Sequence, residues 1–284
     1  MRTWVEAARP RTLPAAIVPV VVGTAAGGVF APWRFAGALV VALALQVAVN
    51  YANDYFDGVR GVDTPDRVGP RRAVASGLVA PARMKVAIAV ALGVAALAGL
   101  ALTVAVGPEL LLVGAASILA ALAYSGGPRP YASAGLGEVF VFVFFGPVAT
   151  IGTTYALSET IPSLAEWISI PVGMLAAAIL VVNNLRDVET DAAAGKRTLA
   201  VRLGPRATRW LYAILVLGAI VAATATAAWF DLRWPYMLVP LGLSIVVAVK
   251  VFRYDGRELI PCLGLTALVH LLFGATTALV LSWS

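Results

Sequence analysis

Long apolar segments separated by short polar connections make up most of the chain. Each is close to the length of about 20 residues that a helix needs to cross the hydrocarbon core of a bilayer. A bilayer offers the backbone no water, so continuous apolar runs of this kind indicate helices, whose hydrogen bonds are internal. The pattern predicts an all-α integral membrane protein, one domain over residues 1–284, with nine transmembrane helices at about 12–30, 35–57, 84–106, 109–125, 135–157, 167–187, 208–230, 235–252 and 260–282.

Composition agrees with a membrane protein and excludes an ordinary soluble domain. Of the 284 residues, 61% are hydrophobic and 13% are charged, whereas soluble domains carry about 25% charged residues. The net charge of +6 does not indicate a nucleic-acid partner, because all Lys and Arg except Arg34 and Arg233 lie in or beside connections on one side of the predicted helices. Cytoplasmic segments are enriched in these residues. We therefore expect a multi-pass protein in lipid, in the cell membrane, with its amino terminus cytoplasmic and its carboxyl terminus external.

The single cysteine and the single histidine exclude two kinds of chemistry. Cys262 has no second cysteine with which to form an internal disulfide. His270 has no ligand-type residue three or four positions away, as a zinc site on a helix would need. Both lie in apolar segments, where packing or a local hydrogen bond is the expected role.

Two acidic clusters mark the cytoplasmic ends of the second and sixth predicted helices. Carboxylates that border hydrocarbon are costly and are usually functional. A merely solvated helix end would explain one such cluster, but two clusters built alike favour a shared site. The first contains Asn50, Asn53, Asp54 and Asp57, with Asp63 shortly after, and the second contains Asn183, Asp187 and Asp191.

The spacing within each cluster predicts one helical face. Asn50, Asp54 and Asp57 are four and three residues apart, and the members of the second cluster follow every four residues, so each set lies on one side of a helix. Two such faces turned toward each other would repel unless cations lay between them. Carboxylate and amide oxygens suit Mg²⁺, which keeps waters and binds phosphate oxygens of a substrate. We expect two Mg²⁺ ions that hold a diphosphate between the clusters.

Basic residues beside the clusters are candidate anchors for the same diphosphate. Lys196 and Arg197 follow the second cluster, Arg71 and Arg72 follow the first, and Arg9 and Arg11 precede the first predicted helix. Loop Lys and Arg also set membrane orientation whether or not they bind a ligand. Both explanations stay open for these residues.

The two clusters resemble the motifs of the UbiA superfamily of intramembrane aromatic prenyltransferases. The first motif stands here as Asn53-Asp54-Tyr-Phe-Asp57 and the second as Asp187-Val-Glu-Thr-Asp191. The resemblance covers essentially the whole chain and implies a nine-helix bundle. It also implies that Asp54, Asp57, Asp187 and Asp191 are catalytic and bind the metal. A longer form of the first motif has a further Asp where Gly61 stands here, and Asp63 is the candidate substitute ligand.

Further stretches resemble the branch of the superfamily that acts on 1,4-dihydroxy-2-naphthoate in menaquinone synthesis. They include Ala8–Pro14, Tyr124–Pro128, Gly135–Glu138, Gly195–Gly204 and Gly256–Ile260. The resemblance implies transfer of a polyprenyl group from its diphosphate to the naphthoate ring, with loss of the ring carboxylate as CO₂, giving demethylmenaquinol. Tyr124 and Arg129 are candidate contacts of the aromatic acceptor, although an interfacial anchor and a topology-setting arginine explain them equally well. Glu138 is either a structural hydrogen-bond partner or a polar contact near that acceptor.

Two other functions were weighed against this one. A sister enzyme would use another aromatic acceptor, such as 4-hydroxybenzoate or homogentisate, with the same acidic clusters. An ion-coupled transporter would also carry intramembrane carboxylates, but its binding sites usually lie near the midplane of the membrane. The acids of this chain lie at helix ends on one side, which favours the prenyltransferase.

Overall fold

The computed structural model describes residues 1–63, 68–69 and 71–282. Over these residues it contains helices and no strand. The long elements are α2 (Pro14–Ala26), α3 (Pro32–Val59), α4 (Pro81–Val106), α5 (Glu109–Ala123), α8 (Ser163–Arg186), α10 (Leu199–Trp229), α11 (Leu241–Arg253) and α12 (Leu259–Ser282). The short ones are α1 (Arg2–Ala8), η1 (Pro10–Thr12), α6 (Gly137–Val143), η2 (Phe144–Val148), α7 (Ala149–Ser158), α9 (Val188–Ala193), η3 (Trp234–Leu238) and η4 (Gly256–Glu258).

Every predicted apolar segment coincides with an apolar helix of the structure. Within the described ranges, seven helical stretches are long and apolar enough to cross a membrane, whereas α2 and α5 are apolar but shorter. The bounds differ most at α2, which ends at Ala26, and at α10, which begins at Leu199 with a kink at Gly204. The all-helical fold, with apolar helices of membrane-spanning length, is therefore confirmed. Nine crossings and the orientation of the termini stay predictions.

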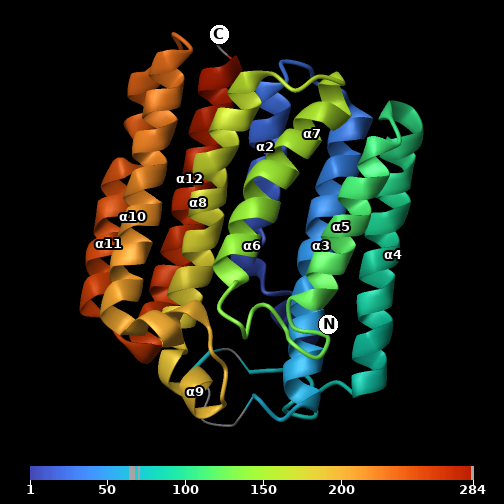
Figure 1. The fold of residues 1–284 in the computed structure, drawn as a ribbon, viewed down its shortest axis with the longest axis vertical. Helices are drawn as coiled ribbons and strands as arrows, with labels where there is room; N and C mark the ends of the chain where they lie inside the picture. Colours follow the sequence, from blue (N-terminus) through green and yellow to red (C-terminus); the bar gives the residue numbers. More distant parts are fainter. Residues whose placement is uncertain (64–67, 70, 283–284) are drawn as a thin grey trace.

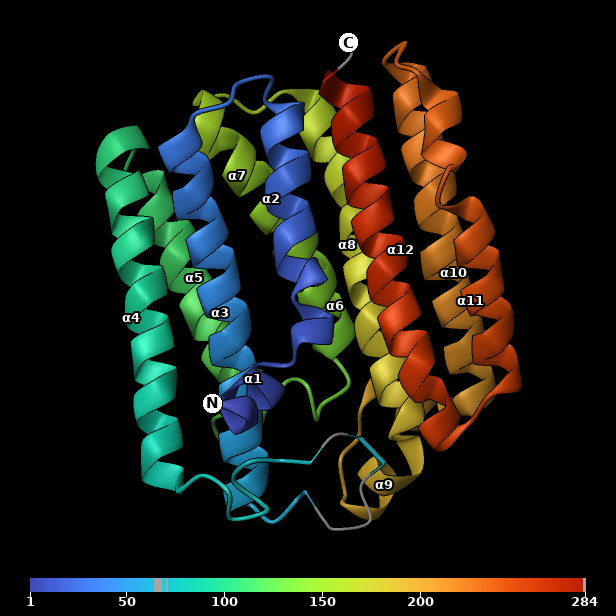
Figure 2. The ribbon, with the colours of Figure 1, turned by 180° about the vertical axis from the view of Figure 1, so that it is seen from behind.

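The long helices stand side by side along the long axis of the molecule, and α9 and the connection after α3 lie at one end (Figures 1 and 2). Helix α8 forms the centre: 72% of the residues in its 18-residue apolar stretch are buried, against 22% for α4. The main hydrophobic core joins α8 to α2, α10 and α12, and includes Leu175, Ile220 and Phe273. The arrangement leaves α3, α4 and α5 as a second group across from α8.

Helices α6 and α7 are joined by a π-helical turn that brings aromatic side chains inward. Pro147 lies within this turn, and proline removes a backbone donor from the helical ladder. A Cβ atom added to Gly146 would lie 2.7 Å from the Cα of Gly173 on α8, so only glycine permits this close approach of the two backbones. The contact holds the turn against α8.

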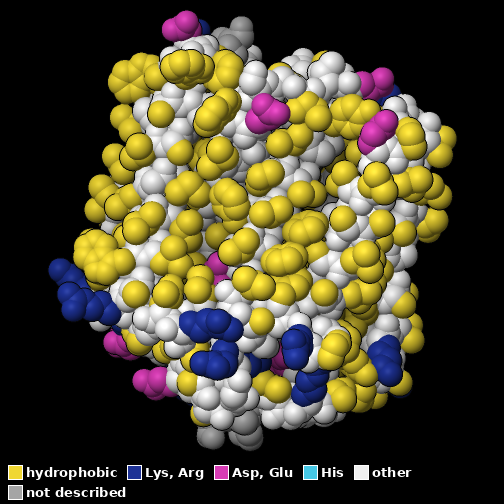
Figure 3. Space-filling view, in the orientation of Figure 1, with side chains coloured by type: hydrophobic (Ala, Val, Ile, Leu, Met, Phe, Trp, Pro, Cys, Tyr) yellow, Lys and Arg dark blue, Asp and Glu magenta, His cyan; other side chains and the backbone are white. Residues whose placement is uncertain are grey.

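Basic side chains gather at one end of the face seen in Figure 3. There Lys and Arg lie over the end that contains α9, while apolar side chains cover most of the body above it. This distribution agrees with the sequence pattern, in which all Lys and Arg except Arg34 and Arg233 lie on one side of the apolar helices.

Candidate active site

One cavity runs between the α3–α5 group and α8, and its two ends differ. Because an α-helix rises 1.5 Å per residue, the part of α3 that lines it, from Ala38 to Asp57, extends about 28 Å. At the α9 end the lining residues are Arg9, Asn53, Asp57, Arg72, Asn183, Asp187, Asp191 and Lys196. Farther along they are apolar and mostly small, among them Ala38, Val41, Leu102, Val113, Gly114, Ala149 and Gly152.

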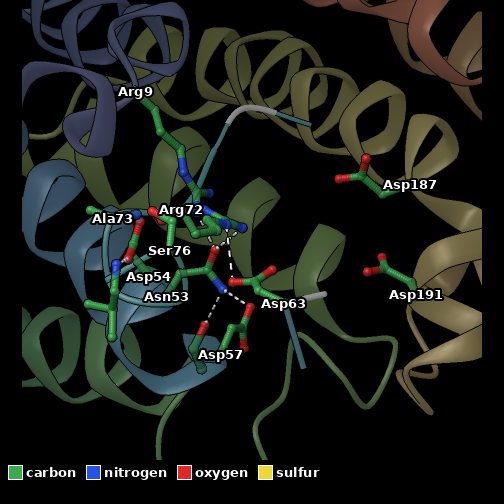
Figure 4. A network of polar contacts seen from close by, with 12 residues as sticks. Arg9, Asn53, Asp54, Asp57, Asp63, Arg72, Ala73, Ser76, Asp187 and Asp191 are labelled. Atoms are coloured by element: carbon green, nitrogen blue, oxygen red, sulfur yellow. Dashed lines mark hydrogen bonds and ion pairs between the residues drawn. The ribbon is translucent and has the colours of Figure 1, made fainter. Parts of the chain in front are cut away.

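Asn53 is the centre of the polar network at the charged end (Figure 4). Its amide nitrogen donates to Asp57 Oδ2 at 2.7 Å and to Ser125 Oγ at 2.9 Å. Its carbonyl oxygen accepts from the guanidinium groups of Arg9 and, at 3.0 Å, Arg72. Two cationic groups thus converge on one neutral oxygen at the cavity wall, which is a favourable place for an anion.

Lys196 connects the two acidic clusters. Its ammonium lies 2.8 Å from Asp57 Oδ2 and 3.9 Å from Asp191 Oδ1. Its side chain is only 13% exposed, so the charge interacts strongly with both carboxylates. The side-chain ammonium group of Lys196 therefore lies between the clusters, where the sequence predicts a metal cation.

Asp187 and Asp191 lie at the junction of α8 and α9, facing the first cluster (Figure 4). Arg186 makes a two-point contact with Asp187, with nitrogen–oxygen distances of 2.8 and 2.6 Å, and also donates to Asn183 Oδ1 at 3.0 Å. This arginine is buried and was predicted only as a cytoplasmic loop residue. Its pairing fixes the direction in which the Asp187 carboxylate points.

Asp54 was predicted to share one helical face with Asn50 and Asp57, but it does not line the cavity with them. It accepts the backbone N–H groups of Ala73 at 3.0 Å and Val74 at 2.8 Å, and it is not one of the cavity-lining residues. The stripe of α3 that lines the cavity instead contains Asn50, Asn53 and Asp57. Asp54 thus holds the segment that carries Arg72, while Asn53 takes the inward position.

Arg9 comes from a backbone conformation that few residues adopt. Its φ of 53° is in the left-handed region, between α1 and η1. Such conformations cost about 1–3 kcal/mol in a residue other than glycine, and they cluster at functional sites. The conformation directs Arg9 to Asn53, so of the two arginines predicted as anchors before the first helix, Arg9 lines the cavity and Arg11 does not.

The remaining predicted residues fall into three groups. Asn50 and Tyr124 line the cavity, and Asn50 donates to the Ala8 carbonyl at 2.8 Å. Asp63 lies 3.2 Å from Arg72 Nε, in a nearly fully buried ion pair. Arg11, Arg129 and Arg197 are exposed and do not line the cavity.

The oxygen-rich lining fits a hard divalent cation. Carboxylates of Asp57, Asp187 and Asp191 and amide oxygens of Asn53 and Asn183 are the ligand types that Mg²⁺ takes. Among the described residues, no three Asp, Glu, His or Cys side chains are already gathered around one point. Basic groups engage the acids instead, and Lys196 marks the position where positive charge is required.

An aromatic wall lies along the cavity near the acids. Tyr131 stacks on Phe140 with ring centroids 4.0 Å apart and meets Tyr124 edge to face at 5.4 Å, and Phe144 continues the row. All four line the cavity. Burial raises the pKa of Tyr131, so its hydroxyl stays protonated and donates to the Ala120 carbonyl at 2.9 Å. The sequence did not single out Tyr131, Phe140 or Phe144.

Comparison with known proteins gives one consistent result. The chain is 46% identical to the 1,4-dihydroxy-2-naphthoate octaprenyltransferase of Mycobacterium tuberculosis, over 97% of this chain and 95% of the relative. It is 38% identical to the enzyme of the same name from Escherichia coli, over 92% and 87%.

Solved structures share the fold. A UbiA homolog from Aeropyrum pernix aligns with a TM-score of 0.74 at 18% identity, over 93% of this chain and 96% of that one. A UbiA homolog from Archaeoglobus fulgidus bound to DMAPP and Mg²⁺ gives 0.69 at 16% identity, over 99% of both chains. The model of the UbiA prenyltransferase family matches residues 14–280. The chain therefore belongs to the UbiA prenyltransferase family.

Proposed function

We propose that this protein transfers a polyprenyl group from polyprenyl diphosphate to 1,4-dihydroxy-2-naphthoate, releasing CO₂ and diphosphate and forming demethylmenaquinol. The charged end of the cavity faces the cytoplasm of the cell membrane, in accord with the clustering of Lys and Arg at that end (Figure 3). All nine predicted apolar segments cross the bilayer, with α6, η2 and α7 together forming one of them, and the chain forms one domain.

The charged end binds the diphosphate. Arg9 and Arg72, which converge on Asn53, and Lys196, which reaches across from the second cluster, supply positive charge to its oxygens. Asp57, Asp187 and Asp191, with the amide oxygens of Asn53 and Asn183, would hold two Mg²⁺ ions. Bound there, these ions would offset the negative charge that develops as diphosphate leaves.

The rest of the cavity serves the organic chemistry. The allylic C–O bond breaks with its electron pair going to diphosphate, and a ring carbon supplies the pair for the new C–C bond. The electron pair of the bond to the carboxylate returns to the ring as CO₂ departs. The faces of Tyr124, Phe140 and Phe144 carry negative potential that stabilises allylic positive charge, and the apolar lining excludes water that would capture it.

The observation that carries this proposal is the meeting of the two acidic clusters across one cavity whose other end is apolar. A site for a diphosphate joined to a long hydrocarbon needs both parts. The two relatives named above are both called 1,4-dihydroxy-2-naphthoate octaprenyltransferase. These names support naphthoate over 4-hydroxybenzoate or homogentisate as the acceptor.

A competition assay tests the proposal. Protein purified into lipid is given Mg²⁺, octaprenyl diphosphate and equimolar 1,4-dihydroxy-2-naphthoate and 4-hydroxybenzoate, and products are identified by mass spectrometry. We expect a decarboxylated, prenylated naphthoquinol that requires Mg²⁺ and is not formed by Asp187→Asn. Prenylated 4-hydroxybenzoate as the main product would overturn the acceptor, and no product from either would overturn the reaction.

A further inference from the structure

One buried carboxylate of the site is not used by the diphosphate chemistry. Glu138, near the start of α6, is 6% exposed. Its Oε1 accepts the amide N–H of Asn184 at 2.9 Å, and its Oε2 has no hydrogen-bond partner among the described residues. Asp57, Asp63 and Asp187 are each paired with Lys or Arg, whereas Glu138 contacts a neutral amide.

This contact fixes the orientation of Asn184. A carboxylate oxygen accepts hydrogen bonds, so the NH₂ end of the amide must face Glu138 and the carbonyl end must face away. Asn184 lines the cavity, and within the described structure its Oδ1 accepts no hydrogen bond. The cavity wall therefore presents a fixed carbonyl oxygen, which is a place for a hydroxyl donor.

The surroundings of this oxygen suit an aromatic ring. Asn184 precedes Asp187 by three residues, so both lie on one face of α8, beside the diphosphate end. Phe140 lines the same cavity as Asn184 and belongs to the aromatic wall that contains Tyr131 and Tyr124. Flat apolar surface and a hydrogen-bond acceptor thus line one cavity, next to its diphosphate end.

We infer that Asn184 accepts a hydrogen bond from a ring hydroxyl of the aromatic acceptor, and that Glu138 is the positioning residue that keeps the Asn184 carbonyl turned toward it. The inference rests on the proposed function and assigns the acceptor subsite. The ring lies against Tyr124 and Phe140, and its hydroxyl points to Asn184.

The test uses Glu138→Gln, which keeps the size of the side chain but can both donate and accept, so the Asn184 amide is free to turn over. Binding of naphthoates is measured by calorimetry on protein in lipid, without Mg²⁺ or prenyl diphosphate. Two probes differ in the hydroxyl they retain: 1-hydroxy-2-naphthoate and 4-hydroxy-2-naphthoate. Glu166→Gln, an exposed change in the first turn of α8, is the matched control.

We expect Glu138→Gln to weaken binding of one probe about fivefold, as loss of one neutral hydrogen bond would, and to leave the other probe unchanged. In steady-state assays KM for 1,4-dihydroxy-2-naphthoate should rise while KM for prenyl diphosphate stays constant. Asn184→Ala should reproduce the same selective loss and provides the test if Glu138→Gln does not fold.

Equal weakening of both probes, a rise in both KM values, or no change at all would overturn the inference while leaving the proposed reaction intact. A wild-type protein that binds naphthoates but makes no prenylated product would instead refute the proposed function and keep the subsite. Wild-type protein that binds neither probe and also makes no prenylated product would refute both.

Discussion

The two ends of the cavity are built by different means. At the charged end, side chains from α3, from the end of α8, from Lys196 after α9 and from the segment around residue 72 contact one another through hydrogen bonds and ion pairs of 2.6–3.2 Å. At the apolar end, Ala38, Gly114 and Gly152 leave space and make no directional contact. Under the proposed function, polar contacts at the charged end govern the reaction, whereas the size of side chains at the apolar end governs which hydrocarbon fits.

The largest effect is expected at the charged end, from Asp57→Asn. This change removes a carboxylate that contacts Lys196 and that we assign to the metal and diphosphate site. We expect kcat to fall by about 10³-fold, comparable with the loss of one group that stabilises transition-state charge. Glu189→Gln, exposed on α9, should stay near the wild-type rate. A modest effect of Asp57→Asn would remove this carboxylate from the chemistry.

Arg9→Ala should have the next largest effect. Hydrogen bonds to charged groups contribute about 1.5–3 kcal/mol, so KM for the prenyl diphosphate should rise by about 10–100-fold with a smaller change in KM for the ring. Arg2→Ala, which loses only an exposed ion pair with Glu6, is the control. If both variants behaved alike, the effect would come from general surface charge.

Asp54→Asn tests whether the charged end depends on a residue outside the cavity lining. The amide offers one acceptor oxygen where the carboxylate offers two, so an N–H of Ala73 or Val74 loses its partner. We expect about 1–3 kcal/mol lower stability, measured by unfolding in detergent. Asp255→Asn breaks an ion pair in which Asp255 is 82% exposed, and should cost less than about 1 kcal/mol. Equal losses would contradict the structural role of Asp54.

The smallest effect, and the one most specific to the apolar end, is expected from Gly114→Leu. A Cβ atom at Gly114 would meet no other atom within 4 Å, and the residue lines the cavity, so leucine would fill space that the prenyl chain uses. The preference for farnesyl over octaprenyl diphosphate should increase about fivefold, since the lower end of steric discrimination in an apolar pocket is worth about 1 kcal/mol.

Gly93→Leu is the matched control for that change. Gly93 also has open space around it but does not line the cavity. Unchanged chain-length preference in Gly114→Leu, or an equal shift in both variants, would show that this part of the cavity does not hold the chain.

The helices were predictable from the sequence because long apolar runs have one stable form in a bilayer. The site was only partly predictable. Asn53 and Asp54 are neighbours on α3, and which one faces the cavity depends on the rotation of the helix and on the N–H groups of the segment after it. Neither the rotation of the helix nor these backbone contacts follows from the spacing of residues in the sequence.

The same limit applies to Arg9 and Glu138. Arg9 and Arg11 lie in an irregular segment, and the left-handed conformation of Arg9 decides which one turns inward. Glu138 and Asn184 are 46 residues apart in the chain, and nothing in the sequence marks them as a pair. By contrast, Lys196 lies beside Asp191 of the second cluster, as expected for a residue only five positions farther along the chain, whereas its role as a diphosphate anchor stays a prediction.

The position of Lys196 links two binding events. Its ammonium spans carboxylates that are 134 residues apart in the chain, Asp57 and Asp191. Under the proposed function, a divalent cation bound by those carboxylates would displace the ammonium and leave it free to pair with a phosphate oxygen. Occupation of the acids by a cation and occupation of the cavity by diphosphate would then be reciprocal equilibria, in which each ligand changes the affinity for the other by the same factor.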